Sequence, residues 1–155
     1  MAQLLISHKQ GKLSLNLPYG VFINGAPVGL MRTQQVRVSL PAGQYDIRVQ
    51  FGGALRVGKK GRILDFSLSG EKRVRVSEEA LTCVDFSDKE RAWNILFDID
   101  LALWAIMLFV TIPSPWNLVY HILSDGFFLI WVVRLIIVRK KYYRLDVYTK
   151  AEKLG

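Results

Sequence analysis

The sequence has little of the chemistry that builds catalytic and metal sites. It contains one cysteine, Cys83, and two histidines, His8 and His121, among 155 residues. A single cysteine excludes an intrachain disulfide and suits a reducing compartment. These three residues lie far apart in the chain, so there is no metal-ligand spacing and no credible Ser-His-Asp order. We therefore expect no metal, no cofactor and no enzymatic activity.

Acidic residues are also scarce, because 13 Asp and Glu residues stand against 21 Lys and Arg, for a net charge of +8. The basic residues are not interleaved with aromatic ones, which argues against a nucleic-acid partner. Residues 1–25 lack the basic start, the apolar core and the small-residue cleavage site of a signal peptide. We expect neither nucleic-acid binding nor a secretory leader.

Two long apolar runs dominate the second half of the chain, at about residues 93–112 and 116–138. A helix of about 20 mostly apolar residues crosses a hydrocarbon core of about 30 Å. Pro113 and Pro115 separate the runs, because proline ends one helix and suits the first turn of the next. The sequence therefore predicts a transmembrane helical hairpin, with its linker, over residues 88–138.

Lysine and arginine indicate the orientation of this hairpin, since cytoplasmic flanks are enriched in both. The connection at 111–120 has neither, whereas both outer flanks are basic. The flanking residues are Lys89, Arg91, Arg139, Lys140, Lys141 and Arg144. We expect a multi-pass protein with both termini in the cytoplasm, the last of them a basic tail at 139–155.

Residues 1–87 are predicted to form a small antiparallel β-sandwich. Apolar and polar residues alternate there with the period of half-buried strands in antiparallel sheets. The clearest strands are 36–40, 45–51, 64–68 and 73–76, and further strands are expected at 3–7, 12–17, 21–23 and 81–86. A short helical linker, capped by Ser87 or Asp88, is expected to lead into the hairpin. The predicted fold class is a membrane protein with a β part followed by an α part.

One stretch of this β domain resembles a known family. Residues 21–29 read as a strand, an Asn24-Gly25 hairpin turn and Val-Gly, and residues 36–49 read as a strand, a Pro-x-Gly turn and an aromatic-x-Ile-x-Val strand. This order is similar to the PEGA domain, a small bacterial β-sandwich found beside membrane anchors. The chain departs from the family at 30–32, where PEGA repeats usually have Thr-Pro. The resemblance implies a binding or spacer module without catalysis of its own, and it assigns no ligand.

A glycine-rich segment at 53–60 has the spacing of a phosphate-binding loop, but Lys60 replaces the Ser or Thr that would hold magnesium. A strand is predicted to follow, whereas phosphate binding needs the N-terminus of a helix there. We therefore expect a hairpin tip, not a nucleotide site, and this tip carries Arg56, Lys59, Lys60 and Arg62.

Two interpretations of the basic residues stay open. They are solvated, or they bind anionic headgroups or an acidic partner, since each basic residue near an anionic bilayer gains about 1 kcal/mol. The candidates for such binding are the four residues of the hairpin tip together with Arg139, Lys140, Lys141 and Arg144. Polar strand faces would extend the patch through Arg37, Arg48, Arg73 and Arg75.

Five ionisable residues interrupt the apolar runs, where charge is costly and marks a candidate functional site. They are Asp98, Asp100, His121, Asp125 and Arg134. Arg134 is expected to pair with Asp98 or Asp100 but not with both, because residues two apart point about 200° apart on a helix. His121 and Asp125 are four apart and share a helix face. For these two, interhelical assembly, a proton or ion path, and an interfacial segment before a later span all stay open.

The sequence therefore favours a non-catalytic inner-membrane scaffold or accessory subunit. Its hairpin would oligomerise or bind a membrane partner in the lipid bilayer, and its cytoplasmic β domain would bind protein or headgroups. The alternative is a small oligomeric ion channel or membrane-disrupting effector, gated by a ligand of the β domain.

Overall fold

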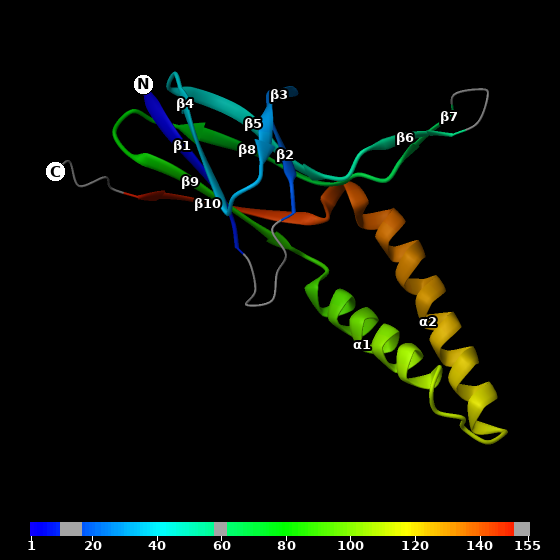
Figure 1. Cartoon of the computed structure of the whole chain (residues 1–155). Helices are drawn as coiled ribbons and strands as arrows, with labels where there is room; N and C mark the ends of the chain where they lie inside the picture. Colours follow the sequence, from blue (N-terminus) through cyan, green and yellow to red (C-terminus); the bar gives the residue numbers. More distant parts are fainter. Residues whose placement is uncertain (10–16, 58–61, 151–155) are drawn as a thin grey trace. The chain divides into compact units, whose positions relative to one another are not determined.

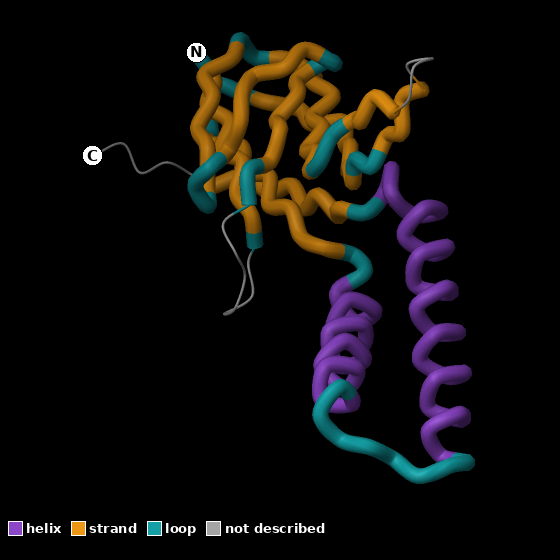
Figure 2. Tube along the Cα trace, turned by 45° about the vertical axis from the view of Figure 1, so that its right-hand side comes forward, coloured by secondary structure: helices purple, strands orange, loops and turns teal. Residues whose placement is uncertain are grey.

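The computed structural model describes residues 1–9, 17–57 and 62–150, and for residues 54–57 and 62–65 it describes the backbone alone. The chain divides into two compact units, Met1–Lys89 with Arg139–Gly155, and Glu90–Val138. We call these the β unit and the helical unit. All strands belong to the first and both α-helices to the second (Figure 2).

Within the described residues, the β unit has two four-stranded sheets arranged as a sandwich, plus a two-stranded ribbon (Figure 1). The first sheet has the order β10-β9-β1-β4, the second has the order β3-β2-β5-β8, and β6 pairs with β7. The strands are β1 (Ala2–His8), β2 (Tyr19–Ile23), β3 (Ala26–Met31), β4 (Gln35–Leu40), β5 (Gly43–Phe51), β6 (Ala54–Val57), β7 (Arg62–Asp65), β8 (Leu68–Val76), β9 (Leu81–Asp88) and β10 (Tyr143–Lys150).

Six of the predicted segments fall within observed strands, namely 3–7, 21–23, 36–40, 45–51, 73–76 and 81–86. The predicted strand at 64–68 is confirmed only at its ends, because β7 ends at Asp65 and β8 begins at Leu68. Most of the predicted strand at 12–17 lies outside the described residues. The prediction gave no bounds for β3 and β6, although it expected a hairpin at each, and it missed β10.

One strand pair departs from the expected antiparallel arrangement. β1 and β9 run parallel, with a register from Leu4 opposite Thr82 to His8 opposite Phe86. No short turn joins these two strands, because the rest of the sandwich lies between them in sequence, so a parallel pair is possible. β9 is then paired on both sides, by β1 and β10, and accordingly reads as a continuous buried run at its start.

The core lies between the two sheets and follows from the alternation in the sequence. In β2, for example, Tyr19, Val21 and Ile23 are buried, and the two residues between them are half-buried. The most deeply buried apolar residues include Leu4, Ile6, Val84 and Phe86 from the first sheet and Val21, Ile47, Val49 and Val74 from the second.

The predicted Asn24-Gly25 turn joins β2 to β3 in a two-residue hairpin. Both residues have positive φ, 50° for Asn24 and 79° for Gly25. Two such residues in sequence are typical of a type I′ turn, whose twist matches that of the flanking strands. The turn pairs Ile23 with Ala26 and so sets the register of the hairpin.

The last described strand corrects the prediction of a basic tail at 139–155. Residues Tyr143–Lys150 form β10, which pairs antiparallel with β9 from Tyr143 opposite Asp88 to Lys150 opposite Leu81. Tyr143 and Leu145 are buried, whereas Arg144 is exposed. The same alternation is visible in the sequence, but its proximity to the basic cluster hid it. The helical unit is thus an insertion between two adjacent strands of one sheet.

Both backbone groups of Tyr142 are hydrogen-bonded where the chain re-enters the β unit. Its N–H donates to the Ser69 carbonyl on β8 at 2.9 Å, and its carbonyl accepts from the Lys89 N–H at 3.0 Å. Next to it, Gly70 passes so close to β10 that an added Cβ would lie 2.4 Å from the Tyr143 carbonyl oxygen. Only glycine allows the two edge strands β8 and β10 to approach this closely.

We expect Gly70→Ala to lower the free energy of unfolding by about 1–3 kcal/mol, because a methyl group there forces backbone apart in a packed region. Gly53→Ala is the matched control, since a Cβ at Gly53 meets nothing within 4 Å, and it should change stability by less than about 0.5 kcal/mol. Thermal unfolding of the full chain in mild detergent, followed by circular dichroism, measures both. Equal stability of the two variants would show that the sheets do not depend on this close approach.

Candidate functional site

The helical unit consists of α1 (Arg91–Met107) and α2 (Trp116–Val138). α2 has the bounds predicted for the second apolar run, whereas α1 ends before residue 112, the predicted end of the first. The predicted linker caps, Ser87 and Asp88, are wrong because both residues lie in β9. Glu90 precedes α1 instead and makes no capping hydrogen bond with its side chain.

Among the described residues, one helix is long and apolar enough to cross a membrane, Trp116–Lys141. It comprises α2 and the 3-10 turn η1 (Arg139–Lys141). α1 has 17 residues, about 25 Å at 1.5 Å per residue, and is shorter than a hydrocarbon core of about 30 Å. The sequence predicted two helices that each span a membrane. The length and composition of the second helix confirm that prediction for α2, and the length of α1 does not.

Aromatic contacts hold α1 and α2 against each other. Phe97 stacks on Trp131 with ring centroids 4.1 Å apart, and Trp93 stacks on Phe127 at 6.1 Å. Residues 93 and 97 lie one helical turn apart, as do residues 127 and 131, so one face of each helix makes the contact. This face also positions the polar side chains of the unit.

One predicted site residue, Asp100, contacts a serine on the facing helix. The Ser124 hydroxyl lies 2.9 Å from one carboxylate oxygen of Asp100 and 3.1 Å from the other. Ser124 is the one residue of α2 that is buried. A cleft of about 230 Å³ lies beside this contact, and Trp104 and Asp125 are among its lining residues.

Arg134 pairs with Glu90 and not with Asp98 or Asp100, so that prediction is wrong. Its guanidinium is 2.5 Å and 3.3 Å from the two carboxylate oxygens of Glu90, and it lies 4.8 Å from the ring centre of Trp93. Such stacking on an aromatic face adds to the ion pair. Sequence reasoning missed Glu90 because it precedes the apolar run.

The antiparallel register of the helices explains this pairing. Asp100 follows Glu90 by ten residues, and Arg134 follows Ser124 by ten residues. The two polar contacts therefore lie about 15 Å apart along the helix pair, at 1.5 Å per residue. A pair between Arg134 and Asp100 would need a shift of one helix by that distance.

The other three ionisable residues predicted in the runs, Asp98, His121 and Asp125, are exposed. Within the described residues, none has a hydrogen bond or ion pair, although His121 contacts the ring of Tyr120. Asp98 is two residues from Asp100 and thus lies on nearly the opposite face of α1. The helix pair satisfies Asp100 and Arg134 and leaves these three side chains without a polar partner.

The basic residues predicted to bind headgroups lie in separate places. Arg56 lies in β6 and Arg62 in β7, while Lys59 and Lys60 lie outside the described residues. The segment after residue 61 is a strand, as predicted, and not the helix of a phosphate-binding loop. Arg139, Lys140 and Lys141 form η1, and Arg144 pairs with Asp146 at 3.0 Å on β10.

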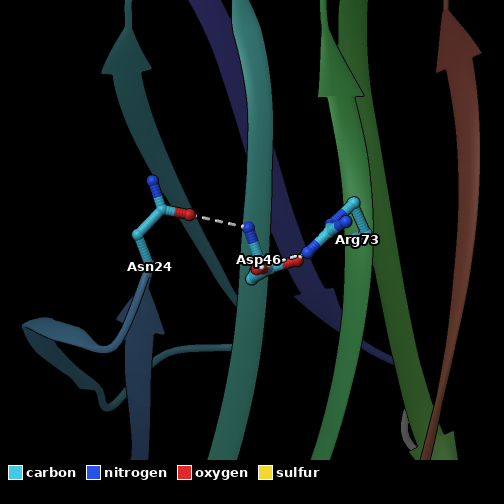
Figure 3. Close-up of polar contacts among 3 residues, drawn as sticks. All are labelled: Asn24, Asp46 and Arg73. Atoms are coloured by element: carbon cyan, nitrogen blue, oxygen red, sulfur yellow. Dashed lines mark hydrogen bonds and ion pairs between the residues drawn. The ribbon is translucent and has the colours of Figure 1, made fainter.

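The strand arginines do not form the single patch that the sequence suggested. Arg37 lies on β4 of the first sheet, whereas Arg48 and Arg73 lie on β5 and β8 of the second. Arg73 donates to Asp46 at 2.8 Å, and this hydrogen bond lowers the pKa of the Asp46 carboxyl. The Asn24 side chain accepts from the Asp46 N–H at 2.8 Å, so the three residues form a chain of contacts across the sheet (Figure 3).

Several titratable side chains meet inside the β unit, at the ends of β1 and β9. His8 stacks on Phe86 at 4.6 Å and lies 4.8 Å from Tyr19, and Tyr143 contacts the same two aromatic residues. Burial raises the pKa of Tyr19 to about 12, and the charge of Asp88 acts in the same direction. Burial also lowers the pKa of His8, where the charge of Asp88 opposes the shift. Sequence reasoning did not anticipate that His8 is half-buried among aromatic side chains.

Comparison with known proteins identifies no family: no family model, no curated protein and no solved structure matches this chain. The likeness to the PEGA domain consequently stays a prediction. What the structure shows is an α+β chain with two four-stranded sheets in a sandwich-like arrangement and two helices.

We expect Ser124→Ala to weaken the helical unit, because it leaves the Asp100 carboxylate without its partner in apolar surroundings. The expected loss is about 1 kcal/mol, typical of an interhelical hydrogen bond in a membrane. Ser114→Ala, in the exposed connection, is the matched control. Unfolding in a detergent series, followed by tryptophan fluorescence, measures the difference, and identical midpoints for the two variants would contradict a stabilising contact.

We also expect the stability of the β unit to fall as the pH drops through about 6.5, the pKa of an unfolded histidine. The folded state lowers the pKa of His8, so it binds fewer protons than the unfolded state, and acid favours unfolding. His8→Phe keeps the ring contact with Phe86 and removes the titration. Melting temperatures between pH 7.5 and 5.5 should therefore depend less on pH in this variant, and parallel curves would exclude His8 as the cause.

Proposed function

We propose that this protein is a non-catalytic accessory or scaffold subunit of the inner membrane. The helical unit inserts into the bilayer, and the β unit stays in the cytoplasm, where it binds a partner. The observation that carries the proposal is an apolar segment that begins and ends on two adjacent strands of one sheet.

The surface of the helical unit supports insertion. Large apolar side chains cover both helices, and they include Trp116, Leu123 and Ile137 at 68%, 67% and 75% exposure. Soluble monomers seldom expose contiguous apolar patches beyond a few hundred Å². α2 is therefore unlike the core helix of a soluble domain, and lipid is the solvent that suits it.

The connection to the β unit supports two crossings. β9 leads into α1 and β10 follows α2, and these strands pair from Asp88 and Tyr143 onward. Paired strands lie on one side of a membrane, so the inserted chain must cross an even number of times. α2 accounts for one crossing. We propose that α1 makes the other, completed by the apolar residues 108–112 at the far interface.

The charge distribution supports cytoplasmic ends. η1 places Arg139, Lys140 and Lys141 directly after α2, and Lys89 and Arg91 lie at the start of α1. The connection at 111–120 has no lysine or arginine. The cations of η1 would then lie beside anionic headgroups, where each gains about 1 kcal/mol.

The polar contacts of the helical unit favour a structural role over the conducting role of the alternative hypothesis. Asp100 and Ser124 bond to each other, and so do Glu90 and Arg134. These four side chains therefore hold the helices together. A scaffold whose hairpin binds further helices, from a second copy or a membrane partner, agrees best with this use of charge.

We expect the connection between the helices and the β unit to lie on opposite sides of the membrane. Single cysteines at Ser114 and at the exposed Ser39, each in a Cys83→Ala background, report the two locations. An impermeant maleimide should label S114C in intact spheroplasts and S39C only after lysis, because the bilayer blocks the reagent. Labelling of S114C only after lysis would contradict insertion across the membrane.

A further inference from the structure

We infer that α2 binds α2 of a second copy of the chain, and that His121 and Asp125 pair between the copies. The inference rests on the proposed membrane insertion and names the partner of the hairpin. It comes from two ionisable side chains of α2. The contacts between α1 and α2 leave both of them without a polar partner.

His121 and Asp125 share one side of α2, because four residues span slightly more than one turn. Ser124, Phe127 and Trp131 face α1, as their contacts show. At 100° per residue, Asp125 lies about 100° around the helix from Ser124. Asp125 borders the cleft beside α1, but it and His121 are exposed, so their face is accessible to another helix.

Hydrocarbon makes a partner for these residues necessary. Asp125 lies nine residues after Trp116, about 14 Å along α2 and thus near the middle of a core of about 30 Å. A lone carboxylate is costly at that depth. A histidine one turn away on another helix offers both a hydrogen-bond donor and, when protonated, the opposite charge.

A second copy satisfies this requirement without any other protein. Copies with their β units on the same side of the membrane have parallel α2 helices. His121 of one copy and Asp125 of the other are then offset by about 6 Å along the axis, which side chains reach between helices packed 8–10 Å apart. A two-fold axis repeats the pair, so the face is complementary to itself. The exposed Leu118 and Leu129 extend the same face above and below the charges.

Charge exchange between copies tests the inference. His121→Asp gives a chain with two acids on this face, and Asp125→His gives a chain with two histidines. Each variant alone should associate at least about tenfold more weakly than the natural chain, because it meets only like groups. The two variants expressed together, with different tags, should form a mixed pair close to natural affinity. Mass measurement in nanodiscs or mild detergent, with pull-down through one tag, reads out both results.

A mixed pair separates pairing between copies from pairing within one helix, because neither variant has both a histidine and an aspartate. Natural self-association of the single variants, or no gain on mixing them, would overturn the inference. Asp98→Asn is the control, because Asp98 is an exposed carboxylate of α1 and the proposed interface lies on α2. This variant should leave association unchanged. The maleimide labelling of S114C reports membrane insertion independently. A failure of assembly is therefore distinguishable from a failure of insertion.

Discussion

The rest of the structure depends on the backbone hydrogen bonds of Tyr142. Its N–H bonds to Ser69 on β8 and its carbonyl to the N–H of Lys89 after β9. These two bonds join the edge of one sheet to the edge of the other, and they bring together the two ends of the inserted helical segment. Backbone groups that leave water must find partners, so this junction admits little variation. Gly70 is the steric counterpart, since any side chain there would collide with the backbone of Tyr143.

The segment leaves and returns between paired strands, and within it the two helices run antiparallel in one register. That register brings Asp100 to Ser124 and, about 15 Å away along the pair, Arg134 to Glu90. The charges thus divide into two groups. One group is satisfied between α1 and α2, and the other, with His121 and Asp125 on α2, has no polar partner within the described residues. The proposed assembly rests on this division, since an apolar solvent would not stabilise unpaired charge.

Local patterns predicted most of the β unit. Alternation located β4, β5 and most of the other strands, and the Asn24-Gly25 dipeptide predicted the β2–β3 hairpin, because positive φ at both positions suits that turn. Pattern reasoning failed for β10, where the basic cluster before it indicated a tail. It also failed for the parallel pair of β1 and β9, since pairing between the ends of a domain has no local signal.

The sequence by itself determined the apolar helices, their proline connection and most of the strands, because propensity and hydrophobic period are properties of neighbouring residues. It also showed which ionisable residues interrupt the apolar runs. Only the tertiary structure decided that the final segment is a strand of the first sheet, and that Arg134 pairs with Glu90 and not with Asp98 or Asp100. The physical reason is that register between distant segments is set by packing and backbone pairing, which no single stretch of the chain encodes.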